Sequence, residues 1–400
     1  MKYRSTRGHS ESVDFSTAVV RGLAPDGGLY VPEQFPSLPR GWDTWSYEQA
    51  VSETLDLYGA SETGHLVKEA AAQFHHPEIA PIIPVGDVEL LELFWGPTLS
   101  FKDHALQVLA RLLDREVDDD GVVLGATSGD TGSAAIEACR GRQNLMIVIL
   151  FPEARVSDFQ RRQMTTVDAE NVRAIAVRGT FDDCQRMVKE AFASYPHLLA
   201  ANSINWGRLA VQTGFHIHAA ARMGEAYDLI VPTGNFGNVY SAWLAKQMGA
   251  PIETITIANN ANHGLSDLVN TGAMPTADVK QTMAPAMDIQ VPSNLERFSA
   301  DPTKEFEASW STDEQIIETI AEVQRTHGYR LDPHTATGWR VAEERRGNRR
   351  QLVVATAHPA KFDDGTAPPS WFPPLNGLEE HSVVIDADIA ELEHRISVKR

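Results

Sequence analysis

The sequence lacks any long hydrophobic run. No window approaches the about 18 uninterrupted apolar residues that a bilayer span requires. The first residues, MKYRSTRGHSESVDFS, carry positive charges but no apolar stretch behind them, which is not typical of a secretory signal. We therefore expect a cytoplasmic protein that does not interact with membranes.

Cysteine is scarce, with only Cys139 and Cys184 in 400 residues. Two cysteines build neither a disulfide framework nor a conventional zinc site. Both fall in segments with a helical pattern, so we expect them to be small buried side chains. The histidines show no metal-ligand spacing either, and we expect no metal.

Positive charge is also in short supply. Lys and Arg number 35 against 54 Asp and Glu, which gives a net charge of -19. A field of that sign repels nucleic acid and anionic membrane surfaces. An anionic ligand must therefore be met by a few positive groups in specific positions.

The chain has no internal repeat and no GxGxxG or P-loop signature, so a nucleotide-binding module is disfavoured. Instead, apolar segments typical of buried strands alternate with helical patterns from about residue 121 onward. This alternation predicts an α/β fold with mainly parallel sheets, and the length suggests two or three packed units. The predicted strands lie in GVVLGATSGD, LMIVILFP, VRAIAVRG, YDLIVPTGNFGN, IETITIAN and QLVVATAH.

Polar loops follow three of these strands, at residues 127–132, 233–238 and 356–361, where ligands collect in parallel sheets. The loop TGNFGN has two glycines between a strand and a helix. It suits a phosphate cup made of backbone N–H groups and a helix N-terminus. The alternative is a tight turn that needs positive φ at Gly234 and Gly237, and spacing alone favours neither.

The loop ATSGDTGSAA can present several donors to a carboxylate at a helix start. The simpler interpretation is an N-cap made by Asp130 or Thr131. On the pattern alone, the cap is favoured.

Lys102 follows Thr98 and Ser100 in GPTLSFKDHALQVLA and precedes an amphipathic helix that Asp103 is placed to cap. A lysine at that position, partly removed from water, suits Schiff-base chemistry. A lone lysine is nevertheless usually a surface residue. Likewise NSINWGRL and TAHPAKF offer Arg208 and Lys361 either to an anion or to surface ion pairs.

Taken together, several blocks of this sequence resemble threonine synthases, in particular the longer-chain branch with an additional N-terminal domain. The blocks occur in order from about Tyr3 to Phe362, which is nearly the whole chain. They are YRSTRG, GLAPDGGLYVPE, LELFWGPTLSFKD, ATSGDTGSAA, NSINWGRLAVQ, VPTGNFGN, AMDIQVPSNLERF and ATAHPAKF.

The resemblance implies a fold-type II enzyme dependent on pyridoxal 5'-phosphate (PLP), with two α/β domains and an N-terminal domain. We expect the N-terminal domain in residues 1–85, a large PLP-binding domain in 86–120 and 216–400, and a smaller domain in 121–215. The implied reaction converts O-phospho-L-homoserine and water to L-threonine and phosphate. The implied assembly is a monomer or a homodimer.

The resemblance also implies residue roles. Lys102 is the expected catalytic residue, which holds PLP as a Schiff base and moves protons. The expected cofactor contacts are Gly234, Asn235, Phe236, Gly237 and Asn238 for the phosphate and Thr356 for the pyridine nitrogen. The expected contacts to the substrate carboxylate and the ring edge are Thr127, Ser128, Asp130 and Thr131. The expected contacts to the substrate phosphate are Asn202, Ser203, Arg208 and Lys361.

A few positions depart from the family pattern, namely Trp95, Ser100, His104 and the run 215–218, which includes His216. One interpretation is drift in packing residues. The other is a specialised relative with another leaving group, such as a phosphonate-bearing amino acid, or another nucleophile. A non-catalytic protein that keeps only the scaffold is a third hypothesis, against which the intact Lys102, TGNFGN and TAHPAKF speak.

Overall fold

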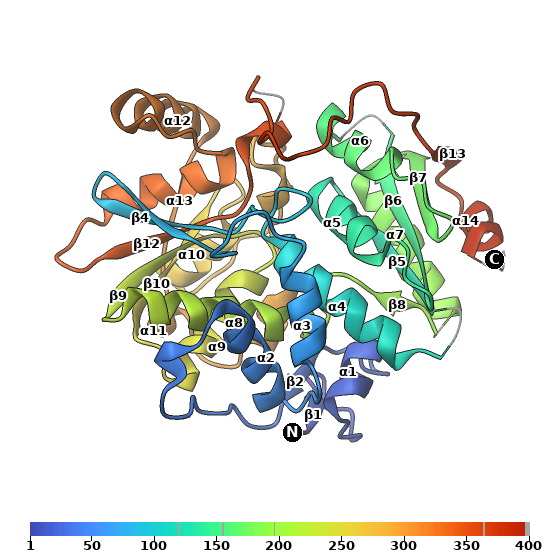
Figure 1. Ribbon diagram of the computed structural model, residues 1–400, viewed down its shortest axis with the longest axis horizontal. Coiled ribbons are helices and arrows are strands. Elements are labelled where there is room, and N and C mark those ends of the chain that lie inside the picture. Colours follow the sequence, from blue (N-terminus) through green and yellow to red (C-terminus); the bar gives the residue numbers. More distant parts are fainter. Residues whose placement is uncertain (119–120, 154–155, 196, 363–364, 397–400) are drawn as a thin grey trace.

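The computed structural model describes residues 1–118, 121–153, 156–195, 197–362 and 365–396. It contains a six-stranded sheet and a five-stranded sheet, each covered by helices, and a two-stranded N-terminal sheet (Figure 1). The predicted α/β class with mainly parallel sheets and an N-terminal part is confirmed.

The larger sheet is parallel except at one edge, where β3 and β4 are antiparallel. Successive side chains along its strands point to opposite faces of the sheet, and both faces are buried. In β9, for example, Leu229 and Val231 pack on one side while Ile230 packs on the other. Burial on both faces explains their nearly continuous apolar sequences. In spatial order the strands are β11 (Glu307–Trp310), β10 (Ile252–Asn259), β9 (Tyr227–Pro232), β12 (Gln351–Ala355), β4 (Val88–Glu92) and β3 (Ile82–Val85).

Helices cover both faces of this sheet. Two lie above it in Figure 1, α12 (Asp313–His327) and α13 (Pro333–Glu344), and two lie below it, α8 (Trp206–Met223) and α9 (Gly237–Met248). Short elements connect them: α10 (Gly264–Thr271), η2 (Pro285–Met287), η3 (Ser293–Arg297), α11 (Pro302–Glu305) and η4 (Pro359–Phe362).

The smaller sheet is parallel throughout, and all eight residues of its central strand β6 are buried, as the run LMIVILFP predicts. In order its strands are β13 (Ser382–Asp386), β7 (Val172–Arg178), β6 (Leu145–Pro152), β5 (Gly121–Ala126) and β8 (Leu199–Ala200). Its helices are α4 (Lys102–Glu116), α5 (Asp130–Cys139), α6 (Asp158–Thr165), α7 (Phe181–Ser194) and α14 (Ile389–Ile396). Cys139 and Cys184 are free and buried here.

The N-terminal part packs on α8 through α2. It consists of β1 (Tyr3–Ser5), α1 (Phe15–Arg21), β2 (Tyr30–Pro32), η1 (Trp42–Thr44), α2 (Tyr47–Leu57) and α3 (Gly64–Ala71). Tyr3 anchors it, because its hydroxyl donates to the Tyr58 carbonyl oxygen at 2.7 Å and its ring contacts Trp206 of α8 edge-on.

Two strands lie outside the units to which the sequence assigned them. β3, expected in the N-terminal domain 1–85, pairs with β4 of the larger sheet. β13, expected with 216–400 in the large domain, pairs in parallel with β7 of the smaller sheet. Figure 1 shows the C-terminal segment, in red, crossing the top of the molecule to reach it. The remaining domain boundaries stay a prediction.

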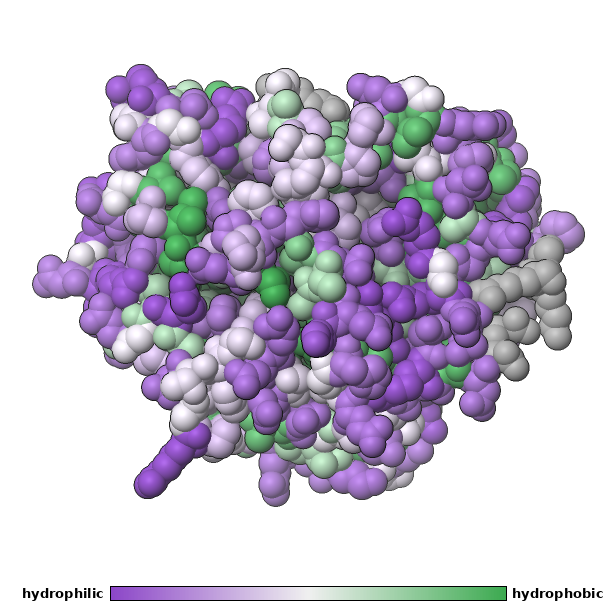
Figure 2. Space-filling view, in the orientation of Figure 1, coloured by the Kyte–Doolittle hydropathy of each residue, from purple (hydrophilic) through white to green (hydrophobic). Residues whose placement is uncertain are grey.

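The face of the molecule in Figure 2 is mostly hydrophilic, and its hydrophobic residues form small separated groups. Among the described residues, no helix combines the length and apolar character needed to cross a membrane.

Candidate active site

Lys102 begins α4, and the preceding loop is attached to the end of β12. The backbone N–H of Phe101 donates to the Thr356 carbonyl oxygen at 2.8 Å, and Ser100 forms a β-bridge with Ala357. The Asp103 carboxylate accepts hydrogen bonds from the Thr98 backbone N–H at 2.8 Å and hydroxyl at 2.6 Å. The expectation that Asp103 caps α4 is therefore wrong, because its carboxylate holds the loop before the helix.

Lys102 is buried, with 9% of its surface exposed, so the surface-lysine interpretation is wrong. Its Nζ lies 3.2 Å from Oδ2 of Asp130, and Nζ of Lys361 lies 3.3 Å from Oδ1. Burial alone would raise the pKa of Asp130, but the nearby Lys102 and Lys361 ammonium groups outweigh it and lower that pKa. One carboxylate is thus shared between two buried lysines.

Two glutamines of α6 complete this cluster. Gln160 donates to Asp130 Oδ1 at 2.9 Å, and Gln163 accepts from Lys361 Nζ at 2.6 Å. Lys361 is fully buried and also donates to the Thr98 carbonyl oxygen at 2.6 Å. Burial lowers the pKa of Lys361, although Asp130 and Asp103 oppose this. The sequence did not single out the glutamines; their only signal is the i, i+3 spacing on one helix.

In the loop 127–132, the Thr127 hydroxyl oxygen accepts from the backbone N–H groups of Gly129 and Gly132, both at 2.9 Å. Thr127 therefore closes the turn, and the N-cap expected from Asp130 or Thr131 is wrong. Ser128 and Thr131 are partly exposed and lie at the start of α5. That they bind the substrate carboxylate stays a prediction.

The loop 233–238 is not a turn with positive φ at its glycines. The left-handed residue is Phe236, with φ of 64°, whereas Gly234 and Gly237 are outside that region. Gly234 is instead required by close approach, since a Cβ there would lie 2.5 Å from the Ala286 carbonyl oxygen. The loop is therefore compact and leads directly into α9.

Asn235 is held by two other loops. Its Nδ2 donates to the Ser203 hydroxyl, and its Oδ1 accepts from the Ser293 backbone N–H at 2.5 Å. The Asn294 side chain donates to the backbone oxygens of Asn235 at 3.1 Å and Ser203 at 3.2 Å. Ser293 and Asn294 were not among the predicted site residues. They stand in the block AMDIQVPSNLERF, which carried part of the family resemblance.

Asn238 is buried, and its Oδ1 lies 2.9 Å from Nε2 of His216. Its Nδ2 is buried and has no hydrogen-bond partner among the described residues. An unsatisfied amide donor at the N-terminus of a twelve-residue helix fits an anion such as the PLP phosphate.

Arg208 is also buried, with 2% of its surface exposed, so the alternative interpretation, that it forms an ion pair at the surface, is wrong. Its guanidinium donates to the Ala201 carbonyl oxygen at 3.2 Å, while Nε has no partner among the described residues. Burial lowers the pKa of Arg208 to about 10. A buried guanidinium with an unsatisfied N–H fits an anionic ligand.

The four residues expected to bind the substrate phosphate have different partners. Ser203 contacts Asn235, and Lys361 contacts Asp130. Among the described residues, Arg208 donates to the Ala201 carbonyl oxygen, whereas Lys361 donates to Thr98 and Gln163. Asn202 is partly exposed in the turn before α8.

Thr356 is buried directly after β12, opposite the Lys102 loop. Its backbone N–H donates to the Thr335 hydroxyl oxygen at 3.3 Å. Thr335 in turn donates to Asp332, the N-cap of α13. These contacts fix the end of the strand that carries Thr356.

Two of the residues that depart from the family pattern have hydrogen-bond partners outside this site. Trp95 Nε1 donates to Glu92 Oε2 at 2.8 Å. His104 Nδ1 lies 2.6 Å from the Tyr47 hydroxyl, and its Nε2 lies 3.1 Å from the Leu93 carbonyl oxygen. These contacts favour the packing interpretation for both residues.

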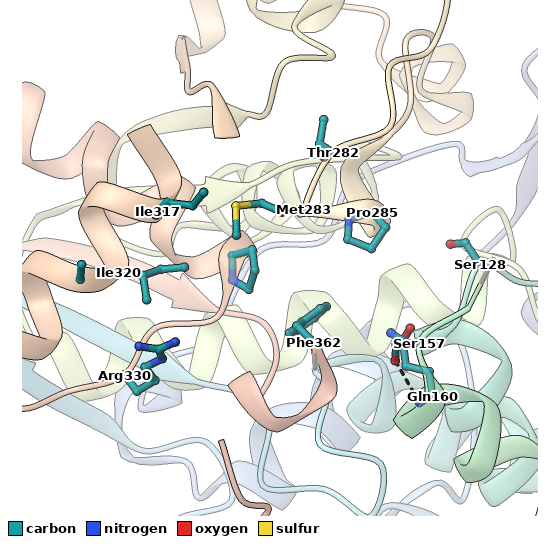
Figure 3. Close-up of a pocket in the computed structure, with 12 residues that line it drawn as sticks. Ser128, Ser157, Gln160, Thr282, Met283, Pro285, Ile317, Ile320, Arg330 and Phe362 are labelled. Atoms are coloured by element: carbon teal, nitrogen blue, oxygen red, sulfur yellow. Dashed lines mark hydrogen bonds between the residues drawn. The ribbon is translucent and has the colours of Figure 1, made fainter. Parts of the chain in front are cut away.

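A cavity of about 390 Å³ opens beside the cluster (Figure 3). Ser128, Ser157 and Gln160 line one end of it, and Ile317 and Ile320 of α12 line the other. Because Gln160 also contacts Asp130, the cavity lies next to the lysine pair. Among the described residues, no group of three His, Cys, Asp or Glu side chains is arranged for a metal.

Comparisons with known proteins assign the chain to a family. Residues 90–358 match the family described as pyridoxal-phosphate dependent enzyme, and residues 2–66 match threonine synthase N terminus. The threonine synthase of Pseudomonas aeruginosa is 37% identical over 99% of this chain and 98% of its own.

Solved structures are equally similar. The PLP-bound threonine synthase of Brucella melitensis superposes with a TM-score of 0.93 at 38% identity, covering 99% of this chain and 98% of that one. The Escherichia coli enzyme superposes with a TM-score of 0.89 at 30% identity, covering 99% of each chain. Fold and site thus define a PLP-dependent enzyme of fold type II. More narrowly, the chain belongs to the threonine synthase family.

Proposed function

We propose that this chain converts O-phospho-L-homoserine and water to L-threonine and phosphate, with PLP held by Lys102. The observation that carries the proposal is a buried lysine, Lys102, in a chain of the threonine synthase family. Two predicted anion-binding sets support it. One is the loop that ends at Asn238, and the other consists of two buried cations, Arg208 and Lys361, the latter paired with Asp130. A phosphorylated cofactor and a phosphorylated substrate together require two such sets.

The residues present fit PLP. The backbone of 234–238, the free amide donor of Asn238 and the N-terminus of α9 suit its phosphate, and the Thr356 hydroxyl suits its ring nitrogen. When bound, PLP acts as an electron sink that acidifies the substrate C–H bonds.

Lys102 removes the Cα proton and then, once it has given up the first, a Cβ proton of the substrate. Protons return to Cγ after phosphate leaves and to Cα as water adds its hydroxyl group to Cβ, so the reaction balances. A base transfers protons only to and from atoms within hydrogen-bond reach, so both carbons must come close to Nζ when the substrate binds. Asp130 contributes a counter-charge 3.2 Å from that nitrogen. The pair thus holds Nζ beside Asp130 in the enzyme without PLP.

The substrate's two anionic groups have separate partners. Ser128 and Thr131, at the start of α5, bind the carboxylate, with the helix N-terminus adding a favourable dipole. Arg208 and Lys361 bind the phosphate and stabilise the charge that develops on it as its bond to Cγ breaks. Asn202 and Ser203 donate further hydrogen bonds to that phosphate.

No observation favours the alternative of a related substrate or another nucleophile, since Trp95 and His104 have partners outside the cluster. Our proposal extends to the finer points of organisation. The enzyme is cytoplasmic and acts as a monomer or homodimer. Its proposed units are residues 1–85, 86–120 with 216–400, and 121–215, except that β3 and the first half of α8 belong with the larger sheet and β13, α4 and α14 with the smaller one.

The test is a product assay on purified protein loaded with PLP. With O-phospho-L-homoserine we expect threonine and phosphate in equal amounts, and neither product from Lys102→Ala. Phosphate release with homoserine instead of threonine would refute the proposal.

A further inference from the structure

His216 lies on α8, two turns after Arg208, and is fully buried. It departs from the family pattern, and its side chain contacts a predicted cofactor-binding side chain, that of Asn238. Its Nε2 is 2.9 Å from Asn238 Oδ1, while its Nδ1 and the Asn238 Nδ2 have no partner among the described residues.

The proton on this histidine can be assigned from its partner. Burial lowers the pKa of His216 to about 4, so the ring is neutral near pH 7 and carries a single N–H. A side-chain amide oxygen only accepts hydrogen bonds, so that N–H is on Nε2. The orientation of the Asn238 amide and the tautomer of His216 therefore determine each other.

The opposite arrangement is possible for an isolated pair. With the proton on Nδ1, the His216 Nε2 would accept from Asn238 Nδ2, and the amide oxygen would turn toward the loop. An oxygen acceptor facing a phosphate is repelled, whereas an NH₂ group donates to it.

We propose that His216 is a positioning residue that fixes the Asn238 amide so that its NH₂ group donates to the PLP phosphate. The inference rests on the proposed placement of that phosphate at residues 234–238. It assigns His216 a role in cofactor affinity rather than in the proton transfers of the reaction.

The test measures PLP binding to the apoprotein by absorbance, independently of turnover. In His216→Leu, which keeps the volume but removes the donor, we expect the dissociation constant to rise about tenfold to a hundredfold. The ³¹P chemical shift of bound PLP should change as well. His216→Gln retains an N–H donor and should recover most of the affinity.

His218→Leu is the matched control, because it removes another buried histidine of α8 whose ring contacts Tyr47 instead. Its apoprotein is expected to lose stability but to bind PLP with wild-type affinity. Equal affinity losses in His216→Leu and His218→Leu, or an unchanged ³¹P shift in His216→Leu, would overturn the inference.

A measurement on the wild-type holoenzyme keeps the inference testable if His216→Leu does not fold. ¹⁵N NMR of His216 should show a protonated Nε2 and a bare Nδ1, and a proton on Nδ1 would refute the proposal. If instead wild-type protein binds no PLP, the proposed function itself fails, which is a distinct outcome.

Discussion

The Nζ of Lys102 lies 3.2 Å from Oδ2 of Asp130, although the two residues follow strands of different sheets. Lys102 begins α4 after β4 of the larger sheet, and Asp130 begins α5 after β5 of the smaller one. Because both side chains are buried, this ion pair links the two sheets at the point where the proposed chemistry occurs.

Replacing Lys102 with Ala should abolish the absorbance band of the Schiff base between PLP and the lysine and lower turnover by at least about 10²–10⁴-fold, the range that a positioned acid or base contributes. Absorbance and threonine formation measure the two effects. Lys304→Ala, at an exposed lysine paired with Asp301, should leave both unchanged. An unaltered absorbance band in Lys102→Ala would contradict the assignment.

Asp130→Asn should lower the free energy of unfolding of the apoprotein by about 3–5 kcal/mol near neutral pH, because two buried ammonium groups lose their counter-charge. The folded pKa of Asp130 is below its unfolded value, so its contribution is present above about pH 4. It is lost as the pH falls further.

Urea unfolding of both proteins across this range checks the prediction. The difference between wild type and Asp130→Asn should be constant above about pH 5 and shrink below about pH 4. A difference that grows on acidification has the wrong sign and would rule out the ion pair as its source.

Asp103 behaves in the opposite way, since burial raises its pKa to about 6 against the hydrogen bonds from Thr98. A group whose pKa is higher in the folded protein than in the unfolded one stabilises the fold below about pH 4, and this stabilisation is lost as the pH rises through 6. Between pH 4 and pH 7, the free energy of unfolding of the wild type should therefore fall by about 2–3 kcal/mol more than that of Asp103→Asn. Parallel pH profiles for the two proteins would exclude a raised pKa at Asp103.

Gly234→Ala should weaken PLP binding about tenfold or more, because the added Cβ would lie 2.5 Å from the Ala286 carbonyl oxygen and must displace the loop. Gly64→Ala is the control, since a Cβ there meets nothing within 4 Å and its φ is not positive. Titration of each apoprotein with PLP measures the effect. Wild-type affinity in Gly234→Ala would show that the loop tolerates the movement.

Tyr47→Phe tests whether His104 belongs to packing rather than chemistry. The variant loses the 2.6 Å contact between the Tyr47 hydroxyl and His104 Nδ1 and leaves a buried acceptor unsatisfied. We expect the free energy of unfolding to fall by about 1–3 kcal/mol with kcat and KM unchanged. A change in KM for substrate without a loss of stability would revive a role of His104 in specificity.

Local pattern was enough to predict the β5, β6, β7, β9, β10 and β12 strands, because buried parallel strands have short, continuous apolar sequences. It did not predict where β13 pairs. SVVID is short and mostly exposed, and its partner β7 is about 200 residues away in the sequence. Pairing at that distance depends on tertiary packing, which no local signal encodes.

The candidate site was predictable in part. The resemblance indicated Lys102, Asp130 and Lys361, and the structure places them within one buried cluster. Gln160 and Gln163 were missed because a glutamine on a polar helix looks the same whether it faces solvent or a buried charge. Of the two interpretations of the loop 233–238, the turn with positive φ at its glycines is wrong, since Gly234 is needed for close packing and Phe236 has the positive φ. The phosphate cup stays a prediction.

The most direct test of the account is the reaction of O-phospho-L-homoserine in water labelled with ¹⁸O, analysed by mass spectrometry. If phosphate departs by cleavage of its bond to Cγ and water adds at Cβ, the label appears in the hydroxyl group of threonine and not in the released phosphate. Labelled phosphate together with unlabelled homoserine would show simple hydrolysis and contradict the account.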